Sequence, residues 1–280
     1  MAKLLDGKAL GLRIREKIKT RIQALPTHPG LGVILVGNDE ASHLYVSLKR
    51  LACEEAGILF ELFLYPSETP EEDLITKVEE LNKRTDIHGI LVQLPLPTQS
   101  ADTVIAAINP LKDVDGFHPE NLERLRTGKP CISSAVALGV VRLIREAVGE
   151  ESFPNKALIV SSPLFAEPLK LLLESENVAV NVVQAEDRDL ETHTREADLL
   201  IVAEGIPKLI TGNMVKPGAI VIDVGTTRTD SGLSGDVDFE SVEPIAGALT
   251  PVPGGVGPMT VAMLLVNILK AYILQKIDKT

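Results

Sequence analysis

The chain has 280 residues, 45% of them hydrophobic and 24% charged, which is enough apolar material for a packed core and unlike the composition of a disordered chain. At about 150 residues per domain, this length predicts one large domain or two ordinary ones. The 28 Lys and Arg against 39 Asp and Glu give a net charge of −11, which disfavours binding to nucleic acid or to an anionic membrane surface.

The sequence predicts neither a membrane span nor a signal peptide. The most apolar run, residues 259–274, is shorter than the roughly 20 residues that cross a bilayer, and Asn267 and Lys270 interrupt it. The N-terminal residues lack the apolar stretch of a signal peptide, so we expect a cytoplasmic protein. Cys53 and Cys131 have neither CxxC nor metal-ligand spacing, and we expect both to be reduced, partly buried thiols.

Short runs rich in Val, Ile and Leu alternate with helical patterns, as is typical of βαβ units and a largely parallel sheet. The predicted strands cover residues 31–36, 58–65, 88–93, 157–161, 179–184, 198–203 and 219–224. The helix after the first strand is predicted to begin after Ser42, as its cap, and to end at Gly57. Its apolar face is predicted to carry Leu44, Leu48 and Leu51. The next helix is predicted to open at Thr69-Pro70-Glu71-Glu72, a capping box with proline at the first helical position.

An irregular stretch, residues 110–155, predicts a boundary between two α/β domains. A helix over about 133–148 leads into the second domain. The last helix, residues 259–276, follows a loop rich in proline and glycine and is able to return to the first domain. We therefore predict a first domain of residues 1–120 plus 259–280 and a second domain of residues 121–258.

Four segments carry candidate site residues. In the first, Tyr45 and Lys49 lie four residues apart on one helical face, close to the end of a strand where ligands bind in open α/β sheets. From this helix alone, a surface lysine beside a half-buried tyrosine is the better interpretation. In the second, Gln93 ends an apolar strand before Leu94-Pro95-Leu96-Pro97; it either binds a ligand or pairs with backbone.

The third segment, residues 112–119, contains Asp113 and Asp115. Two aspartates in a loop suit a cation, but no further carboxylates cluster with them, so a single acceptor for a ligand's donors is the simpler hypothesis and a solvated turn is the alternative. The fourth segment, residues 250–260, is too rich in glycine and proline for a helix or a central strand. It indicates a stiff loop that lets backbone approach a ligand closely.

In combination these segments resemble the bifunctional methylenetetrahydrofolate dehydrogenase/methenyltetrahydrofolate cyclohydrolase family. The resemblance extends over nearly the whole chain, including residues 198–203, 215–225 and 235–239. It implies a folate-binding catalytic domain, a Rossmann-like nucleotide-binding domain, a folate site in a cleft between them, and a homodimer formed through the nucleotide-binding domains. The implied substrates are tetrahydrofolate derivatives, the implied cofactor is NADP, and no metal is expected.

The resemblance also implies residue roles. Lys49 matches the family's catalytic lysine, Gln93 the glutamine that holds it, Tyr45 the tyrosine that packs on the pterin, and Asp115 the aspartate that binds the pterin. Residues 253–255 match a loop that closes over the folate. A lysine amine in a desolvated pocket beside a cationic substrate loses proton affinity, which suits proton transfer with the attacking water.

The nucleotide-binding half departs from the family pattern. Where the family has Gly-Arg-Ser and Val-Gly-x-Pro, this chain has Ser161-Ser162-Pro163-Leu164-Phe165-Ala166-Glu167-Pro168. Gln184-Ala185-Glu186-Asp187 replaces a basic segment, Glu204 replaces an apolar residue, and Pro130-Cys131-Ile132-Ser133 replaces Pro-Cys-Thr-Pro. The residues left to bind a cofactor are Ser161, Ser162 and Thr226.

We therefore expect a cyclohydrolase in which NADP binding and the dehydrogenase activity are weak or absent. NAD is a conceivable substitute, since an acidic residue after the second strand suits the ribose hydroxyl of NAD. Three alternatives stay open: a fully bifunctional enzyme, a folate-binding protein without catalysis, and an unrelated dinucleotide-binding oxidoreductase, which leaves the first domain's motifs without a purpose.

Overall fold

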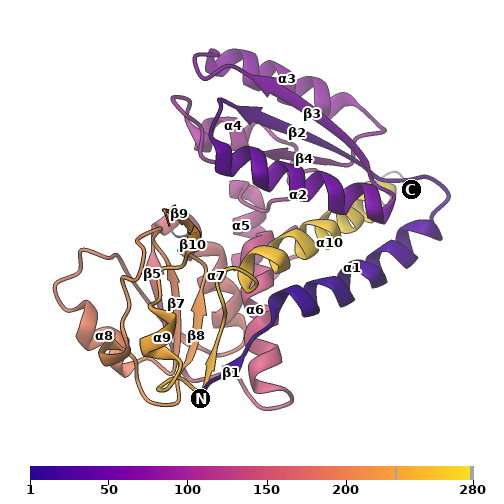
Figure 1. Cartoon of the computed structure of the whole chain (residues 1–280). Coiled ribbons are helices and arrows are strands. Elements are labelled where there is room, and N and C mark those ends of the chain that lie inside the picture. Colours follow the sequence, from indigo (N-terminus) through magenta and orange to yellow (C-terminus); the bar gives the residue numbers. More distant parts are fainter. Residues whose placement is uncertain (231, 278–280) are drawn as a thin grey trace. The chain divides into compact units, whose positions relative to one another are not determined.

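The computed structural model describes residues 1–230 and 232–277, which form two compact units (Figure 1). One unit, called here the three-stranded unit, comprises Leu12–Ala135 and the chain from Val261 onward. The other, the six-stranded unit, comprises Met1–Gly11 and Val136–Thr260. The chain passes between them within helix α1 (Gly7–Gln23), at the start of α6 (Ala135–Val148) and within α10 (Val256–Ile277). The prediction of α/β architecture is confirmed in both units.

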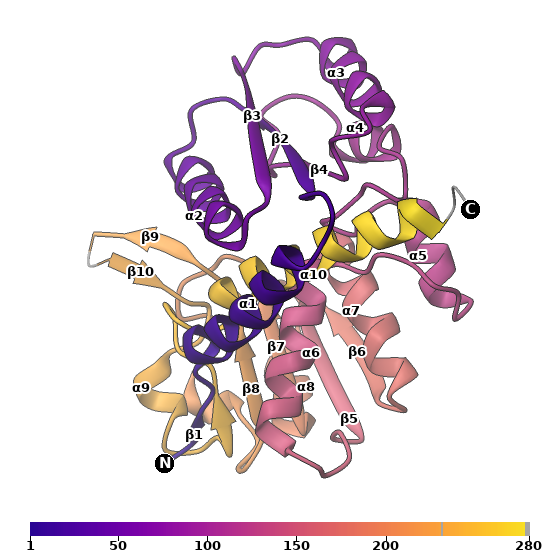
Figure 2. The ribbon, with the colours of Figure 1, turned by 90° about the vertical axis from the view of Figure 1, so that its right-hand side faces the viewer.

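The three-stranded unit is built on a parallel sheet in the order β3-β2-β4. Every residue of β2 is buried, as a strand covered on both faces requires. Helix α2 lies on one face of this sheet and α3 and α4 on the other (Figure 2). The bounds are β2 Gly30–Val36, α2 Glu40–Ala56, β3 Leu59–Tyr65, α3 Glu71–Lys83, β4 Gly89–Val92, α4 Ala101–Ala106 and α5 Pro119–Arg126.

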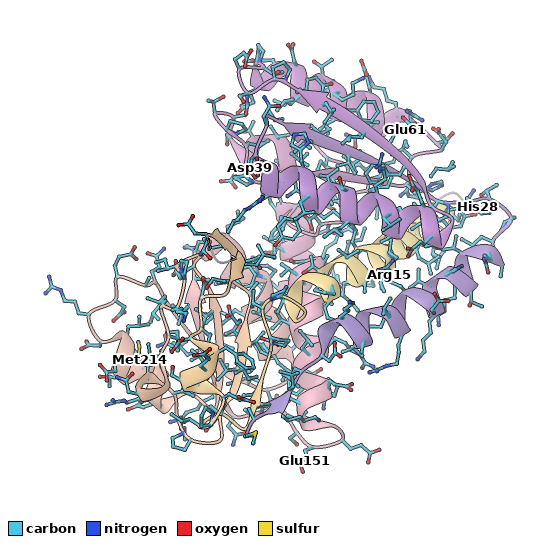
Figure 3. All side chains as sticks on the ribbon, in the orientation of Figure 1. Arg15, His28, Asp39, Glu61, Glu151 and Met214 are labelled. Atoms are coloured by element: carbon cyan, nitrogen blue, oxygen red, sulfur yellow. The ribbon has the colours of Figure 1, made fainter. Side chains whose placement is uncertain are left out.

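Helix α2 differs from its prediction in two ways. Its N-cap is Asp39, not Ser42: the Asp39 carboxylate accepts a hydrogen bond from the Ser42 N–H at 2.8 Å, and Figure 3 shows Asp39 at the start of the helix. The predicted end at Gly57, with φ of 82°, is confirmed. The predicted leucine face is wrong. Its three leucines are about half exposed, because the helix turns the face that carries Val46, Lys49 and Ala52 toward the sheet; the leucines are Leu44, Leu48 and Leu51.

The six-stranded unit holds one parallel sheet in the order β1-β11-β8-β7-β5-β6, with α6 and α7 on one face and α8 and α9 on the other (Figures 1 and 2). The predicted Rossmann-like sheet is confirmed. The bounds are β1 Lys3–Leu4, β5 Lys156–Ser161, α7 Pro163–Ser175, β6 Ala179–Val183, α8 Leu190–Glu196, β7 Leu199–Ala203, the 3-10 turn η1 Gly212–Met214, β8 Ile220–Asp223, β9 Thr227–Thr229, β10 Gly232–Ser234, α9 Phe239–Val242 and β11 Ala248–Leu249.

The units divide the chain differently from the predicted boundaries at residues 1–11, 121–135 and 259–260. Residues 1–11 belong to the six-stranded unit, because β1 pairs with β11 at its edge, Lys3 opposite Ala248. Residues 121–135 belong to the three-stranded unit, because two residues of α10 donate hydrogen bonds to this segment: Asn267 to the Ser133 carbonyl and Lys270 to the Cys131 carbonyl. Periodicity carries no information on either contact.

The long helix α10 is apolar enough to cross a membrane by length and composition, but 67% of its most apolar window is buried within the protein. It contributes Leu264, Leu265 and Ile268 to the buried core. A core helix explains this composition. Both cysteines, Cys53 and Cys131, are buried free thiols.

Candidate active site

Lys49 is held inside the three-stranded unit although lysine is rarely buried. It lies on the sheet-facing side of α2 and is only 7% exposed. Its Nζ donates a hydrogen bond to the Gln93 Oε1 at 2.9 Å. The helix that begins directly after β2 therefore brings Lys49 to the residue that follows β4, the neighbouring strand.

Gln93 is oriented by its own backbone surroundings. Its N–H donates to the Ile34 carbonyl at 2.9 Å, which extends the pairing of β4 with β2 by one residue. The side-chain Nε2 donates to the Leu94 carbonyl at 2.7 Å. With the amide nitrogen so engaged, Oε1 is the atom that faces Lys49, so Gln93 presents an acceptor and not a donor to the amine.

Asp115 lies on a loop that runs beside β4. Ile90 of β4 donates its N–H to the Lys112 carbonyl at 2.7 Å, which starts this loop next to the strand that Gln93 follows. The neighbouring Asp113 is not a second ligand-binding carboxylate: it accepts the N–H groups of Gly116 and His118 at 3.0 and 2.8 Å and closes the loop on itself. The hypothesis of one available acceptor, Asp115, agrees with this arrangement.

The Asp115 loop is fixed from its other side as well. Gly116 has φ of 82°, and a Cβ there would lie 2.3 Å from the Ser133 carbonyl carbon, so only glycine fits. Asn267, in α10, donates through Nδ2 to the Val114 and Ser133 carbonyls at 2.9 and 2.8 Å. The residue before Asp115 is therefore pinned to a helix from the far end of the chain.

The charges of Lys49 and Asp115 act on each other. Burial lowers the pKa of the Lys49 amine, and the Asp115 charge opposes that effect. Burial raises the pKa of the Asp115 carboxyl, and the Lys49 charge opposes that effect. An amine with reduced proton affinity, oriented by an amide oxygen and within the field of a carboxylate, is able to accept and return a proton. Tyr45 is half-buried one turn before Lys49 on the same helix.

Sequence reasoning overlooked Asp113 and Asn267 as positioning groups. Asp113 is 1% exposed and Asn267 is 1% exposed. The signal for Asn267 was available: a lone amide within an apolar helix is buried at little cost only if it makes hydrogen bonds. No comparable signal distinguished Asp113 from Asp115, because the two differ in loop geometry alone.

The remaining predicted site residues belong to the six-stranded unit. Pro253, Gly254 and Gly255 precede α10, and the Gly254 carbonyl accepts the Lys8 N–H at 2.9 Å. Gly254 has φ of 114°, so glycine is required there. The predicted contact of this loop with the folate stays a prediction.

The candidate cofactor residues lie at the carboxyl ends of strands in the six-stranded sheet, either as the last residue of a strand or just after it. Ser161 ends β5 and is fully buried, Ser162 stands at the N-cap position of α7 without a side-chain capping hydrogen bond, and Thr226 is exposed after β8. Register places the carboxyl ends of β5, β6 and β7 side by side, with Ser161 opposite Ala203 and Val160 opposite Val183. Across residues 1–230 and 232–277, no group of three or more His, Cys, Asp or Glu side chains is arranged to hold a metal ion.

Comparison with known proteins gives full-length matches. The family model "Tetrahydrofolate dehydrogenase/cyclohydrolase, catalytic domain" matches residues 5–115, and the model of the NAD(P)-binding domain of the same family matches residues 134–276. The bifunctional protein FolD of Bordetella avium is 48% identical over 276 residues, covering 96% of this chain and 97% of the relative.

Solved structures agree with these matches. The bifunctional FolD methylenetetrahydrofolate dehydrogenase/cyclohydrolase of Campylobacter jejuni is 40% identical, with a TM-score of 0.93 and coverage of 98% of this chain and 100% of that one. The Trypanosoma brucei enzyme, solved with NADP cofactor and an inhibitor, is 33% identical with a TM-score of 0.92, covering 98% of each chain. The chain therefore belongs to the tetrahydrofolate dehydrogenase/cyclohydrolase family.

Proposed function

We propose that this chain hydrolyses 5,10-methenyltetrahydrofolate to 10-formyltetrahydrofolate, with Lys49, Gln93, Asp115 and Tyr45 as its site. The observation that carries the proposal is the buried Lys49–Gln93 hydrogen bond of 2.9 Å, on an amine that also feels the Asp115 charge. Burying an amine costs folding free energy, and a purely structural role does not explain that cost. Proton transfer does, because it requires an amine with a lowered pKa.

The reaction is a hydration followed by ring opening. Water adds to the cationic methenyl carbon, and the neutral Lys49 amine takes the proton that the water loses as the new C–O bond forms. The bond from that carbon to N5 then breaks, N5 takes up a proton, and the hydroxyl loses its proton to become the formyl oxygen on N10. One proton is released overall. Lys49 cycles between amine and ammonium and ends unchanged.

The other three residues orient the reactants. The Gln93 Oε1 accepts a hydrogen bond from Nζ and directs the amine. The Asp115 carboxylate suits the ring amide and exocyclic amino group of the pterin, since a carboxylate accepts two hydrogen bonds side by side. The half-buried Tyr45 ring lies on the same side of α2 as Lys49, where it packs on the pterin.

The test is hydrolysis of methenyltetrahydrofolate by the full chain. Wild type is expected to exceed the spontaneous rate, and Lys49→Met to lose about 10²–10⁴-fold in turnover, the usual range for a general base. Lys77→Met is the control, because Lys77 lies on α3 of the same unit, where it pairs with Glu80 outside the proposed site. Wild-type turnover equal to the spontaneous rate contradicts the proposal.

A second candidate function is the dehydrogenase. Relatives that match the chain from end to end are named bifunctional, and one was solved with NADP. These comparisons favour an enzyme with both activities over the expectation that the dehydrogenase activity is lost. Oxidation of methylenetetrahydrofolate, measured with NADP and with NAD, tests it. The homodimer and the cytoplasmic location stay predictions.

The residues where NADP would lie do not fit its phosphates in their present positions. A dinucleotide binds at the carboxyl ends of the strands, with its pyrophosphate at the turn between the first strand and helix. Here that turn leads from β5 into α7, where Pro163 supplies no N–H at the first helical position. The Glu204 carboxylate stands at the same edge. We therefore derive no step through NADP.

A further inference from the structure

The crevice for a dinucleotide in the six-stranded unit lies between β5 and β7. From β5 the chain proceeds to β6 on one side of β5, and from β6 it returns to β7 on the other side. The direction of strand order reverses there, and open α/β sheets bind their ligands outside the strand ends at such a reversal. Glu204 is the first residue after β7 and so stands at this crevice.

Glu204 reaches across the end of β5. Its Oε1 accepts a hydrogen bond from the Ala185 N–H at 3.1 Å. Ala185 is the second residue after β6, and β5 lies between β6 and β7 in the sheet. The carboxylate of Glu204 therefore bridges the two strands that flank β5, in front of the turn where a pyrophosphate would have to lie.

The bridge is anchored at its base. The N–H groups of Glu204 and Gly205 both donate to the Asp236 Oδ2, at 2.7 and 3.0 Å. Asp236 is fully buried, so the backbone that carries Glu204 is fixed. Burial raises the pKa of the Glu204 carboxyl, and the charges of Glu186 and Asp236 raise it further.

Negative charge is concentrated at the carboxyl ends of these strands. Glu186 and Asp187 follow the bridged Ala185 directly, and Arg188 follows them. A carboxylate after the second strand suits the free hydroxyls of an NAD ribose and repels the 2′-phosphate of NADP. The Glu204 carboxylate is bonded to the residue that precedes this acidic segment, so its charge acts on the pyrophosphate and also on the 2′-phosphate that only NADP carries.

We infer that Glu204 is a specificity-determining residue of the nucleotide-binding unit: its carboxylate, bonded across the end of β5, opposes the phosphates of a dinucleotide and opposes NADP more strongly than NAD. The inference deepens the second candidate function and rests on it for the class of ligand. It concerns binding alone and is separate from the hydrolysis at Lys49.

Two substitutions separate the charge from the bridge. Glu204→Gln keeps an oxygen acceptor for the Ala185 N–H and removes the charge, whereas Glu204→Ala removes both. Glu196→Gln is the matched control, because Glu196 lines a pocket with Lys156 and Ala179, the first residues of β5 and β6, at the opposite edge of the sheet. The measurement is isothermal titration calorimetry of the full chain with NADP and with NAD, with thermal unfolding as the check of folding.

Glu204→Gln is expected to bind NADP at least 10-fold more tightly than wild type, with a smaller gain for NAD, and Glu204→Ala is expected to gain at least as much. Glu196→Gln is expected to match wild type. NADP affinities of both Glu204 variants within about two-fold of wild type overturn the inference, as does the failure of every variant to bind either nucleotide. Hydrolysis of methenyltetrahydrofolate by wild type is scored separately, so a failure of the proposed function and a failure of this inference are distinguishable.

Discussion

The two units differ in the charges that they bury. The three-stranded unit buries two lysines as well as a carboxylate: the Asp115 charge acts on Lys49, and Lys112 donates to three carbonyls at the end of α3 and just beyond it. In the described part of the six-stranded unit the buried charged side chains are the carboxylates Asp223 and Asp236, and the Asp236 charge raises the pKa of both Asp223 and Glu204.

The difference in buried charge affects how each unit would receive its ligand. A methenyl substrate is cationic, and a site that lowers the proton affinity of its lysine and retains a carboxylate tolerates that charge. A dinucleotide is anionic, and carboxylates at the strand ends oppose it. The two units share parallel strands with helices on both faces, so side chains at the strand ends, and not the fold, distinguish them.

The largest expected effect tests whether complementary pairing stabilises the three-stranded unit. Asp113→Ala leaves the N–H groups of Gly116 and His118 without their acceptor and removes one of the two acceptors of the Asn121 Nδ2, which keeps the Pro110 carbonyl. At roughly 1–3 kcal/mol for each orphaned donor, we expect a loss of about 5 kcal/mol in the free energy of unfolding. Urea denaturation measures it. Glu79→Ala, exposed on α3, is the control and should change little; equal effects of the two would show that the loop needs no such anchor.

The next effect concerns the carboxylates of the six-stranded unit. Burial, together with the Asp236 charge, raises the pKa of Asp223 to about 7 from an ordinary 3.8, despite three backbone N–H donors. Between these pH values the folded chain binds more protons than the unfolded chain. The contribution of protonated Asp223 to the free energy of unfolding is therefore complete below pH 3.8 and is lost as pH rises through 7. The loss is at most about 4 kcal/mol.

The measurement is urea unfolding from pH 5 to pH 8 for wild type and Asp223→Asn. The difference between them should depend on pH, with wild type losing stability relative to the variant as pH rises. A constant difference would mean that Asp223 ionises normally in the fold, and the contrast between the units would then rest on Glu204 alone.

A buried histidine of the three-stranded unit, His88, has the opposite pH response to Asp223. Burial, with the charges of Lys276 and Lys112, lowers the pKa of His88 to about 4 from an ordinary 6.5, and its Nδ1 accepts the Gly30 N–H at 3.1 Å. The unfolded chain binds more protons between these pH values. The contribution of neutral His88 to the free energy of unfolding, roughly 3 kcal/mol, is therefore present above pH 6.5 and is lost as pH falls through 4. NMR titration of the His88 ring checks it; a pKa near 6.5 would remove the contrast.

Much of the fold could be predicted from sequence because parallel, doubly covered strands are apolar throughout. β2 and β7 are examples, and the strands predicted for both units are present. The two-residue strands β1 and β11 are too short to show a period, and their pairing places Lys3 opposite Ala248, far apart in the sequence. The prediction that the leucines of α2 face the sheet was wrong, because hydrophobicity alone does not show which of two apolar faces meets the sheet.

The candidate site was predicted as far as residue types and motif spacing allow. Lys49 and Gln93 lie 44 residues apart, and only the pairing of β2 with β4 makes them neighbours. The anchors of Asp115 escaped prediction because their partners are backbone groups, which every residue has. Asn267 contacts a carbonyl 153 residues earlier, and no local pattern encodes such a contact.

The smallest expected effect tests whether Gln93 changes the proton affinity of Lys49 or only contacts it. Gln93→Leu removes the acceptor of the Nζ hydrogen bond, so the ammonium form is less stable, the pKa of Lys49 falls further, and the rise of hydrolysis with pH moves to lower pH. Turnover should fall about 10-fold, which is 1.4 kcal/mol. Gln93→Glu places a carboxylate there and should move the same rise to higher pH. The pH profiles of the two variants are the measurement: shifts in opposite directions require that Gln93 acts on the proton affinity of Lys49, whereas a common shift, or none, leaves Gln93 a strand-end amide whose contact with the amine is only structural.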